Sequence, residues 1–443
     1  MSQQESELTR LARDIFLSAL KKVDAGQAIN DAVRLRENIL TVAGEQIDLS
    51  KFSGVYAVAI GKAAYPMAAA LDTILKGYIK AGLVSGTRQA TDDHTFGEAW
   101  SQFEGGHPLP NEASISAARA CLEMLEKADT EAALVIFLIS GGGSAMMEAA
   151  RDPDVTLSEL RETNHVLVTS GASISEINSV RRAISAIKGG GLARKAPNCR
   201  QITLLISDTL ADDITSIASG PTLKPAAGLP DADAVVKKYE LESHLPVRIR
   251  ELISNKPAEK GTFPSASTAH VLLDNSTATR AAAEAATSAG LLVEAGRNEY
   301  DASIDVGCKA LLDKCIAKKK AASDEKTVCL ISGGEFGCEV VGNGVGGRNS
   351  ETVLRLALLA EEKEMEAEFA FLSAGTDGID GNSPAAGGVA DHCSLQKATK
   401  MGFDPRSFLA DSDSFTFLDR IGASIMTGPT GTNVRDIRLL LMR

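Results

Sequence analysis

Strand-length apolar runs, separated by alanine-rich stretches of helical length, dominate this chain. The runs lie at Val55–Ile60, Ala133–Ile139, Ile202–Ile206, Val271–Leu273, Val328–Ile331 and Phe369–Leu372. Apolar runs without polar alternation are typical of parallel strands that helices cover on both faces. The 39 glycines and an aromatic content of 4% agree with α/β layers joined by tight turns. The pattern therefore predicts an α/β fold built on parallel strands.

Two further segments organise the chain. Residues 5–24 predict a helix, because their apolar side chains fall on one stripe made of Leu8, Leu11, Ile15, Phe16 and Leu20. Residues 255–267 lose this periodicity and are rich in Pro, Gly, Ser and Lys, which predicts a linker. A length of 443 residues allows two or three domains. We therefore expect an N-terminal domain at 1–254 and a C-terminal domain at 268–443.

Charge and cysteine usage restrict the partners and the compartment. A net charge of -12 offers no global positive field for nucleic acid or an anionic membrane. The seven cysteines form no C-x-x-C pair, so we expect reduced thiols in a cytoplasmic protein rather than a zinc cluster or disulfides. The charged N-terminus is no signal peptide, and no apolar run is long enough to span a bilayer.

Polar and glycine residues follow most of the apolar runs directly. These strand ends are Gly61-Lys62, Ser140–Ser144, Ser207–Asp213, Ser332–Glu335 and Ser373–Gly378. Ligands of open α/β sheets bind at the carboxyl ends of strands. Such repeated strand ends therefore predict one or two assembled sites.

Each of these positions also has a plain structural interpretation. Gly141–Gly143 lets backbone N–H groups approach an anion, but it also suits a tight strand-to-helix turn. Lys62 is either a phosphate ligand or a surface lysine. Asp208, Asp212 and Asp213 either hold Mg²⁺ or cap a helix. The spacing alone leaves these alternatives open.

A second glycine-rich segment, Gly342–Gly347, formally fits the dinucleotide pattern G-x-G-x-x-G. We expect a short strand at Cys338–Val341 before it and a helix at Ser350–Ala360 after it. Arg348 at the helix start suits phosphate charge better than the uncharged packing of a dinucleotide turn, so we favour anion binding here. Asp377 lies in a T-D-G-I-D-G turn without the remaining calcium ligands, and we expect it to orient a substrate hydroxyl.

Longer motifs resemble a known family, the class II glycerate 2-kinases. Their N-terminal domain is matched by GKAAYPMAAAL at 61–71, GGHPLPNEASISAA at 105–118, SGGGSAMM at 140–147, INSVRRAISAIKGGGLA at 177–193 and SDTLADDITSIASGPT at 207–222. Their C-terminal MOFRL domain is matched by GNGVGGRNSE at 342–351, AGTDGIDGNSPAAGGV at 374–389 and TGPTGTNVRDI at 427–437. The resemblance implies a Rossmann-like three-layer N-terminal domain, an α/β MOFRL domain and an active site in the cleft between them.

The resemblance also implies an activity and its residues. It implies ATP- and Mg²⁺-dependent phosphorylation of D-glycerate to 2-phosphoglycerate, with a hydroxy acid and a nucleotide as partners. The sequence leaves the oligomeric state open, with a homodimer as one alternative. The matching catalytic residues are Lys62, Arg348 and Asp377. Those for substrate and nucleotide are Ser140, Gly141, Gly142, Gly143, Ser144, Lys188, Ser219, Gly220, Gly346, Gly347, Asn349, Thr376 and Asp380. The expected metal ligands are Asp208, Asp213 and Glu335.

Two departures from the family pattern bear on this expectation. Phe336-Gly337 stands where the family usually has two threonines, and Ala211 stands where it has glycine. They leave open a related acceptor such as a tetronate, or a small-ligand sensor. A further alternative is an NAD(P)H-dependent hydroxypyruvate reductase that uses Gly342–Gly347. That enzyme needs a ribose-binding acid at a strand end, whereas Glu364, Glu366 and Glu368 precede the next predicted strand.

Overall fold

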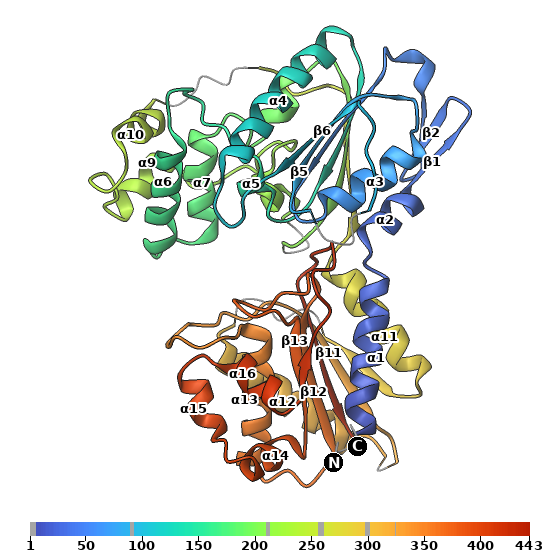
Figure 1. The fold of residues 1–443 in the computed structure, drawn as a ribbon, viewed down its shortest axis with the longest axis vertical. Coiled ribbons are helices and arrows are strands. Elements are labelled where there is room, and N and C mark those ends of the chain that lie inside the picture. Colours follow the sequence, from blue (N-terminus) through green and yellow to red (C-terminus); the bar gives the residue numbers. More distant parts are fainter. Residues whose placement is uncertain (1–5, 89–92, 210–212, 256–260, 297–301, 324) are drawn as a thin grey trace. The chain divides into compact units, whose positions relative to one another are not determined.

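The computed structural model describes residues 6–88, 93–209, 213–255, 261–296, 302–323 and 325–443. The chain forms two compact units (Figure 1). The N-terminal unit is Ala25–Leu272, and the C-terminal unit is Met1–Asp24 together with Leu273–Arg443. The domain boundaries expected from the linker, 1–254 and 268–443, differ from this packing division and stay a prediction. Ala211, Asp212 and part of the expected linker (256–260) lie outside the described residues.

A six-stranded sheet in the order β6-β5-β4-β7-β8-β9 forms the centre of the N-terminal unit, counted over the residues described. The pairs β4–β5, β4–β7, β5–β6 and β7–β8 are parallel. Every residue of β4 and β7 is buried, because helices cover both faces, and this confirms the prediction from the apolar runs. The strands are β4 Val55–Ile60, β5 Ile79–Gly86, β6 Trp100–Glu104, β7 Leu134–Ile139, β8 Arg200–Ile206 and β9 Ser267–Leu273.

Helices on the two faces of this sheet make a three-layer arrangement. One face buries apolar side chains against α4 and α8, among them Val58, Phe137, Cys121 and Leu192. On the opposite face α3 contacts β4, β5 and β7 (Figure 1). The helices on the two faces are α3 Ala64–Ile74, α4 Glu112–Thr130, the single turn α5 Gly143–Met146, and α8 Gly191–Lys195.

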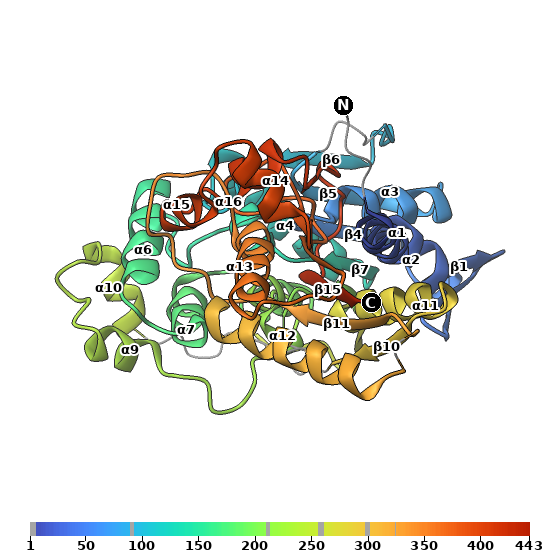
Figure 2. The same cartoon turned by 90° about the horizontal axis from the view of Figure 1, so that it is seen from below.

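Four further helices form a second apolar core in the N-terminal unit, gathered at one end of that unit in Figure 2. They are α6 Leu157–Thr169, α7 Ile174–Ile184, α9 Ala232–Lys238 and α10 Val247–Ser254. Side-chain capping boxes begin α6 at Thr156 and α7 at Ser173, which satisfies backbone donors that a helix start leaves unpaired. The unit also contains α2 Ala25–Ala32, a β1-β2-β3 meander (Val33–Arg36, Ile39–Val42, Glu45–Asp48) and the 3₁₀ turns η1 Leu49–Lys51 and η2 Ile214–Ser219.

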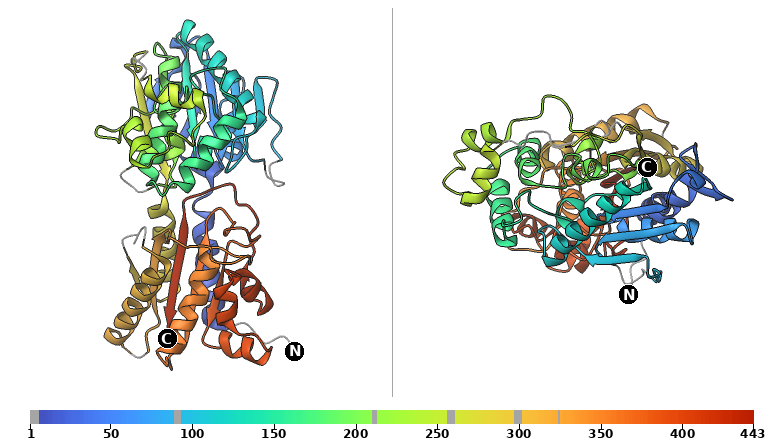
Figure 3. Two further views of the ribbon diagram at one scale, coloured as in Figure 1. Left: turned by 90° about the vertical axis from the view of Figure 1, so that its left-hand side faces the viewer. Right: turned by 90° about the horizontal axis from the view of Figure 1, so that it is seen from above.

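The sheet of the C-terminal unit is mixed, with the order β10-β11-β15-β12-β13-β14. Only β10 and β11 pair in parallel, and β15 runs antiparallel to both β11 and β12. In the side view of Figure 3 the red strand β15 runs along the middle of this unit. The strands are β10 Leu292–Ala295, β11 Val328–Gly334, β12 Phe369–Gly375, β13 Gly387–Asp391, β14 Ser424–Ile425 and β15 Asp436–Met442.

The prediction of parallel strands is therefore confirmed for Val328–Ile331 on its β10 side only, since β11 is antiparallel to β15. It is wrong for Phe369–Leu372, because β12 pairs antiparallel with both β13 and β15. Helices α12 and α13 pack on one face of the sheet, and α1 and α11 pack on the other. These strands are therefore apolar along their whole length, whether they pair in parallel or antiparallel. Burial on both faces, rather than strand direction, sets the apolar pattern. The helices are α1 Glu7–Lys21, α11 Asn275–Ser288, α12 Ile304–Ala321, α13 Arg348–Glu362, α14 Ser394–Lys400, α15 Pro405–Ala410 and α16 Ser414–Arg420.

The predicted N-terminal helix is α1, which Ser6 caps by accepting the N–H of Thr9. Its buried side chains include Leu8, Ile15 and Phe16, as the apolar stripe predicts. These residues pack in the C-terminal unit, where α1 contacts α11 and β12 and lies beside α11 in Figure 2. The first helix of the sequence thus completes the core of the last domain.

The short strand predicted at Cys338–Val341 does not form. Val340 is 77% exposed and Val341 is 66% exposed. The segment bonds instead to the turn between α15 and α16, where the Val341 N–H donates to Ser412 Oγ at 3.1 Å. None of the described helices combines the length and the apolarity that a bilayer crossing needs.

Candidate active site

The carboxyl ends of β4 and β7 bring Lys62 and the Ser140–Ser144 loop together. The strands are parallel neighbours in register, with Ile60 opposite Ile139. The Lys62 N–H donates to the Gly141 carbonyl at 2.9 Å, and the Ala63 N–H donates to Ser140 Oγ at 3.0 Å. Gly61 has a φ of +113°, and a side chain there would overlap the Ser140 carbonyl, so only glycine allows this contact.

The Ser140–Ser144 loop offers backbone donors. The Ser140 N–H donates to the Ile60 carbonyl. The N–H groups of Gly141 to Ser144 donate to no acceptor in the described part of the chain. Consecutive backbone donors at a strand-to-helix turn suit an anion. Asp208 lies beside them, because a side chain at Gly141 would overlap its carboxylate.

A strained turn at Ala218–Gly220 packs on the same loop. All three residues are left-handed, with φ of 50°, 62° and 62°. Ser219 Oγ lies 3.0 Å from Ser144 Oγ, and the Ser219 carbonyl accepts from the Gly189 N–H at 3.0 Å. Left-handed non-glycine residues cost free energy, which the surrounding structure must offset. The predicted residues Ser144, Ser219 and Gly220 are thus brought together.

Lys188 forms a buried ion pair with Glu148. The lysine is 2% exposed. Glu148 also accepts the Ser185 hydroxyl at 2.8 Å and the Ala149 N–H at 3.0 Å. Burial lowers the pKa of Lys188, and the charge of Glu148 opposes that shift. The predicted ligand role of Lys188 stays a prediction, while its charge is already matched inside the protein.

Asp213 has partners of its own, because its carboxylate accepts the Thr215 hydroxyl at 2.8 Å and also the Ser216 hydroxyl. It immediately precedes η2, but its side chain accepts no backbone N–H of that turn, so the capping alternative stays open. Over the residues described, no group of three or more His, Cys, Asp or Glu side chains is arranged to hold a metal. The predicted metal roles of Asp208, Asp213 and Glu335 stay predictions.

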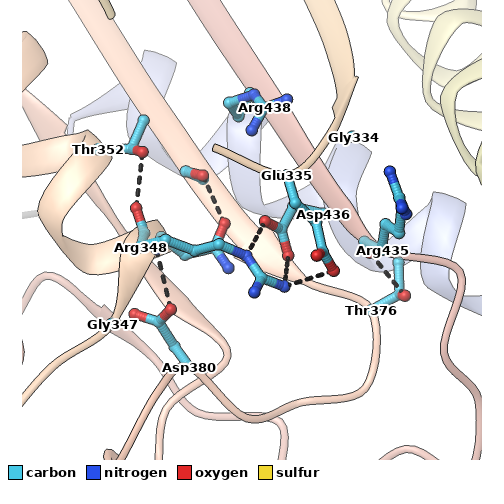
Figure 4. A network of polar contacts seen from close by, with 12 residues as sticks. Gly334, Glu335, Gly347, Arg348, Thr352, Thr376, Asp380, Arg435, Asp436 and Arg438 are labelled. Atoms are coloured by element: carbon cyan, nitrogen blue, oxygen red, sulfur yellow. Dashed lines mark hydrogen bonds and ion pairs between the residues drawn. The ribbon is translucent and has the colours of Figure 1, made fainter. Parts of the chain in front are cut away.

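In the C-terminal unit, Arg348 is the centre of an ion-pair network (Figure 4). Its Nε donates to Asp436 Oδ2 at 2.6 Å, and its Nη2 donates to Asp436 Oδ1 at 3.1 Å and to Glu335 Oε1 at 2.7 Å. The topology explains this, since Asp436 begins β15 opposite Gly334 of β11 and Gly375 of β12. Burial alone would lower the pKa of Arg348, but Asp436 and Glu335 outweigh that effect and raise it.

Asp380 anchors the start of α13. Its Oδ1 accepts the Asn349 N–H at 2.9 Å, and its Oδ2 accepts the Ser350 N–H at 2.8 Å and the Ser350 hydroxyl at 2.7 Å. Burial raises the pKa of Asp380, and these hydrogen bonds oppose the rise. Asn349 is 1% exposed, and its Oδ1 accepts the Ser373 hydroxyl at 2.6 Å. The helix start that was expected to hold an anion is therefore occupied by an internal carboxylate.

In the glycine-rich loop before α13, backbone N–H groups donate hydrogen bonds to protein oxygens. The Asn343 N–H donates to Asp411, the Val345 N–H to Asp413, the Gly346 N–H to Asn382 and the Gly347 N–H to Ser350. Side chains at Gly342, Gly344, Gly346 and Gly347 would overlap Asp411, Asp413, Ser414 and Asp380. These glycines are required by packing, and the geometry gives no backbone cradle for a phosphate.

Thr376 and Asp377 form the turn after β12. The Thr376 hydroxyl donates to the Arg435 carbonyl at 2.7 Å and accepts the Val434 N–H at 2.8 Å. Asp377 and Asp436 both approach Gly375, because a Cβ on this glycine would lie 3.1 Å from Asp377 Oδ1 and 3.5 Å from Asp436 Oδ1. Asp377 is therefore close to the Arg348 network.

Sequence reasoning missed Asp436 and Arg438. Arg438 is 1% exposed, and its Cζ lies 3.9 Å from the ring centroid of Phe336, one of the two departures from the family pattern. It also donates to the Gly333 carbonyl. The available signal was an acid and an arginine in the C-terminal run D-I-R-L-L-L-M, which we did not assign as a strand.

Together, the fold and these sites define a two-unit α/β protein with basic side chains at strand ends. Residues 11–254 match a domain of unknown function, DUF4147, and residues 328–436 match the MOFRL family. The chain is 36% identical to a D-glycerate 2-kinase of Thermotoga maritima, over 86% of this chain and 89% of that protein. It is 37% identical to a protein of Agrobacterium vitis named a putative hydroxypyruvate reductase, over 87% of this chain and 98% of that protein.

A crystal structure of a glycerate kinase from Thermotoga maritima superposes with a TM-score of 0.81 and 31% identity, covering 98% of this chain and 99% of that one. The chain therefore belongs to the class II glycerate kinase family, with its DUF4147 and MOFRL domains. The family assignment confirms the resemblance seen in the sequence. The expectation of an active site in an interdomain cleft stays a prediction.

Proposed function

We propose that this protein is a glycerate 2-kinase, which transfers the γ-phosphoryl group of ATP to the 2-hydroxyl of D-glycerate. One observation carries the proposal beyond family membership. Lys62 follows β4 directly beside a loop whose backbone donors, from Gly141 to Ser144, have no acceptor among the described residues. A lysine and aligned N–H groups at one strand edge are what a transferring phosphoryl group requires, because this chemistry depends on positioning and charge neutralisation.

Arg348 supplies a second positive charge in the proposed mechanism. Asp436, which is buried, fixes the guanidinium from one side through two hydrogen bonds. The side chain of Glu335 is 34% exposed and makes one contact to Arg348. An anionic oxygen can replace Glu335 without disturbing the Asp436 contact. In this proposal the guanidinium therefore keeps its orientation while it exchanges an internal carboxylate for phosphoryl oxygens.

Asp377 is the proposed orienting group for the acceptor hydroxyl. Its carboxylate accepts the Ile379 N–H at 3.2 Å, which fixes it in the turn after β12. A carboxylate so placed can accept the hydroxyl proton as the phosphoryl group is transferred. Asp436 lies close by and orients Arg348, and Asp377 is the proton acceptor in this proposal.

In this proposal, Mg²⁺ is bound mainly by the phosphates of the nucleotide. The described residues form no cage of three ligands, but Mg²⁺ in kinases is commonly held by one or two carboxylates and the substrate phosphates. Asp208, beside the Gly141 backbone, is the carboxylate we propose for this role. When bound, the ion neutralises phosphate charge. Asp213 is a weaker candidate, since its oxygens already accept two hydroxyl groups.

The test is a coupled ADP-release assay over a panel of hydroxy acids that includes D-glycerate and tetronates, with and without Mg²⁺. We expect Lys62→Ala and Arg348→Ala each to lower kcat by about 10²–10³. Lys127→Ala and Arg406→Ala, at exposed positions, serve as matched controls. Near wild-type turnover in both active-site variants would exclude the mechanism.

NADH oxidation, followed in parallel, tests the reductase alternative. The name of the Agrobacterium relative is consistent with that activity. The Gly342–Gly347 segment is not, because no strand leads into it and its N–H groups are engaged by protein oxygens. A pyrophosphate needs free donors at that turn. We therefore expect no ATP-independent oxidation of NADH with hydroxypyruvate.

A further inference from the structure

A cavity of about 240 Å³ lies in the N-terminal unit, between α6, α7 and the loop that precedes α4. All of its lining residues belong to this unit. Its wall has an apolar part and a polar part. The apolar part is Pro108, Pro110, Leu160, Leu167 and Ile184, and the polar part includes His107, Ser144, Glu148, Asn164 and Arg181.

Arg181 provides a positive charge at this cavity that forms no direct ion pair with a carboxylate of the described residues. Its Nη1 donates to Asn178 Oδ1 at 3.4 Å, and its Nη2 donates to Asn164 Oδ1. Both acceptors are neutral amides. Throughout the described ranges, no carboxylate lies within ion-pairing distance of this guanidinium. A guanidinium has five N–H donors, so donors remain for a ligand after these two contacts.

Glu148, the acidic residue of the wall, acts on Arg181 through its charge but forms its ion pair with Lys188 instead. Both of its oxygens accept hydrogen bonds from neighbouring groups, and its charge is matched by the buried amine of Lys188. Asn164 and Asn178 fix the guanidinium from α6 and α7. The result is an oriented cation on the wall of a partly apolar cavity, where an anion interacts more strongly than it does in water.

The cavity adjoins the proposed phosphoryl site. Gly142 lines it, and a Cβ on Gly142 would lie 3.2 Å from Lys62 Cγ and 3.1 Å from His107 Cδ2. A ligand in the cavity therefore has Lys62 at one side. At the liquid volume of about 30 Å³ per water, the space equals about eight waters, which suits a small organic acid.

We propose that Arg181 binds the carboxylate of the acceptor and that this cavity selects small hydroxy acids. The proposal rests on the kinase function, since it names the site of the acceptor substrate. A single guanidinium matches one carboxylate in charge and in its two-pronged geometry. The apolar wall of Leu160, Leu167 and Ile184 suits a short carbon chain. A nucleotide phosphate would bring more negative charge than the cavity neutralises.

Kinetics of Arg181→Gln and Arg181→Lys test the proposal. We expect Arg181→Gln to raise the KM for D-glycerate about 10- to 100-fold, with the KM for ATP within twofold of wild type. Arg181→Lys keeps the positive charge but lacks the two-pronged guanidinium, so we expect a smaller rise in the KM for D-glycerate. Arg182→Gln is the matched control, because this neighbour on α7 bonds Ser179 and does not line the cavity. An unchanged KM for glycerate, or a raised KM for ATP instead, overturns the proposal.

Binding without nucleotide separates this inference from the proposed activity. Titration calorimetry with D-glycerate, D-lactate and glycerol is done on the wild-type chain, the two Arg181 variants and Arg182→Gln. We expect both acids, but not glycerol, to bind wild type and Arg182→Gln, and the acids to bind Arg181→Gln at least 10-fold more weakly. If wild type shows this pattern but transfers no phosphate, the cavity assignment stands and the kinase assignment fails. If wild type, Arg181→Lys and Arg181→Gln all bind the acids with equal affinity, the cavity assignment is refuted.

Discussion

The buried pair of Lys188 and Glu148 gives the sharpest stability prediction. Lys188 is 2% exposed and Glu148 is 9% exposed. Glu148→Gln keeps the shape of the side chain and its hydrogen bond with the Ser185 hydroxyl, but it leaves the ammonium group of Lys188 buried without a countercharge. The variant therefore isolates the charge of the carboxylate from its packing.

The expected loss is about 3 kcal/mol at pH 7. Removing one partner of a buried ion pair costs about 3–5 kcal/mol. We take the lower end, because the lysine can lose its proton and so limit the penalty. For a unit of this size, about 2–4 °C per kcal/mol gives a fall in Tm of about 6–12 °C. Glu126→Gln, which breaks the exposed pair with Lys195, is the control and should cost under about 1 kcal/mol.

The pH dependence provides a second, independent check. Burial already lowers the pKa of Lys188 below its ordinary 10.5, and Glu148 opposes that shift. Without Glu148 the folded variant binds this proton less readily still, while the unfolded chain keeps it up to about pH 10.5. Where the unfolded state binds more protons, stability rises with pH. The gap between Glu148→Gln and wild type should therefore shrink between pH 7 and pH 9.5.

Urea unfolding at both pH values measures this gap. A cost under about 1 kcal/mol at pH 7, or a gap that widens toward pH 9.5, refutes the reasoning. Replacing both partners with apolar residues, Glu148→Leu with Lys188→Met, should recover most of the loss. Recovery of stability in this double variant would indicate that the charge of Lys188 serves to balance Glu148 within the fold rather than to bind a ligand.

Two further predictions concern the C-terminal unit, and both are measured by thermal unfolding. Gly307→Ala should cost about 1–3 kcal/mol, because the new methyl group would overlap the Phe336 ring, and the cost should largely vanish in a Phe336→Ala background; additive losses would contradict this. Asp436→Asn should cost about 2–3 kcal/mol through its two charged contacts with Arg348, whereas Glu335→Gln, about a third exposed, should cost under about 1 kcal/mol. The reverse order would show that Glu335 is the main anchor.

The sequence was sufficient for the strands of the N-terminal unit. Val55–Ile60 is β4 to the residue, and Ile202–Ile206 lies within β8. These strands are buried on both faces, so their apolar runs are unbroken and easily recognised. The edge strand β6 was not found, because its exposed residues give it the composition of a loop.

The C-terminal unit was harder for a topological reason. β15 is the last strand of the chain and lies between β11 and β12, so its position depends on contacts across more than 60 residues. Local periodicity carries no information about such pairing. Its buried Arg438 also hides the apolar pattern of the strand, although the guanidinium packs on Phe336 as an apolar side chain would.

The residues of the candidate site also fall into a group that the sequence predicted and a group that it did not. Strand-end reasoning placed Lys62, Ser140 and Gly141 correctly at one edge, since adjacent parallel strands in register end together. It could not find Asp436, because that residue becomes a partner of Arg348 only through the central position of β15. The metal role expected for Glu335 stays a prediction, and in this structure its carboxylate pairs with Arg348.

The two glycine-rich loops explain the limit of such reasoning most clearly. Gly141–Gly143 and Gly342–Gly347 look alike as sequences, and each leads into a helix. The first leads into the single turn α5 and the second into the longer helix α13. Near Gly141 the backbone donors have no acceptor in the described chain, while the N–H groups from Asn343 to Gly347 all donate to protein oxygens. A glycine can be required because a ligand approaches the backbone or because a neighbouring side chain does. Only the position of acceptors such as Asp413 and Asp380, distant in sequence, distinguishes the two cases, and it favours the first loop as the anion site.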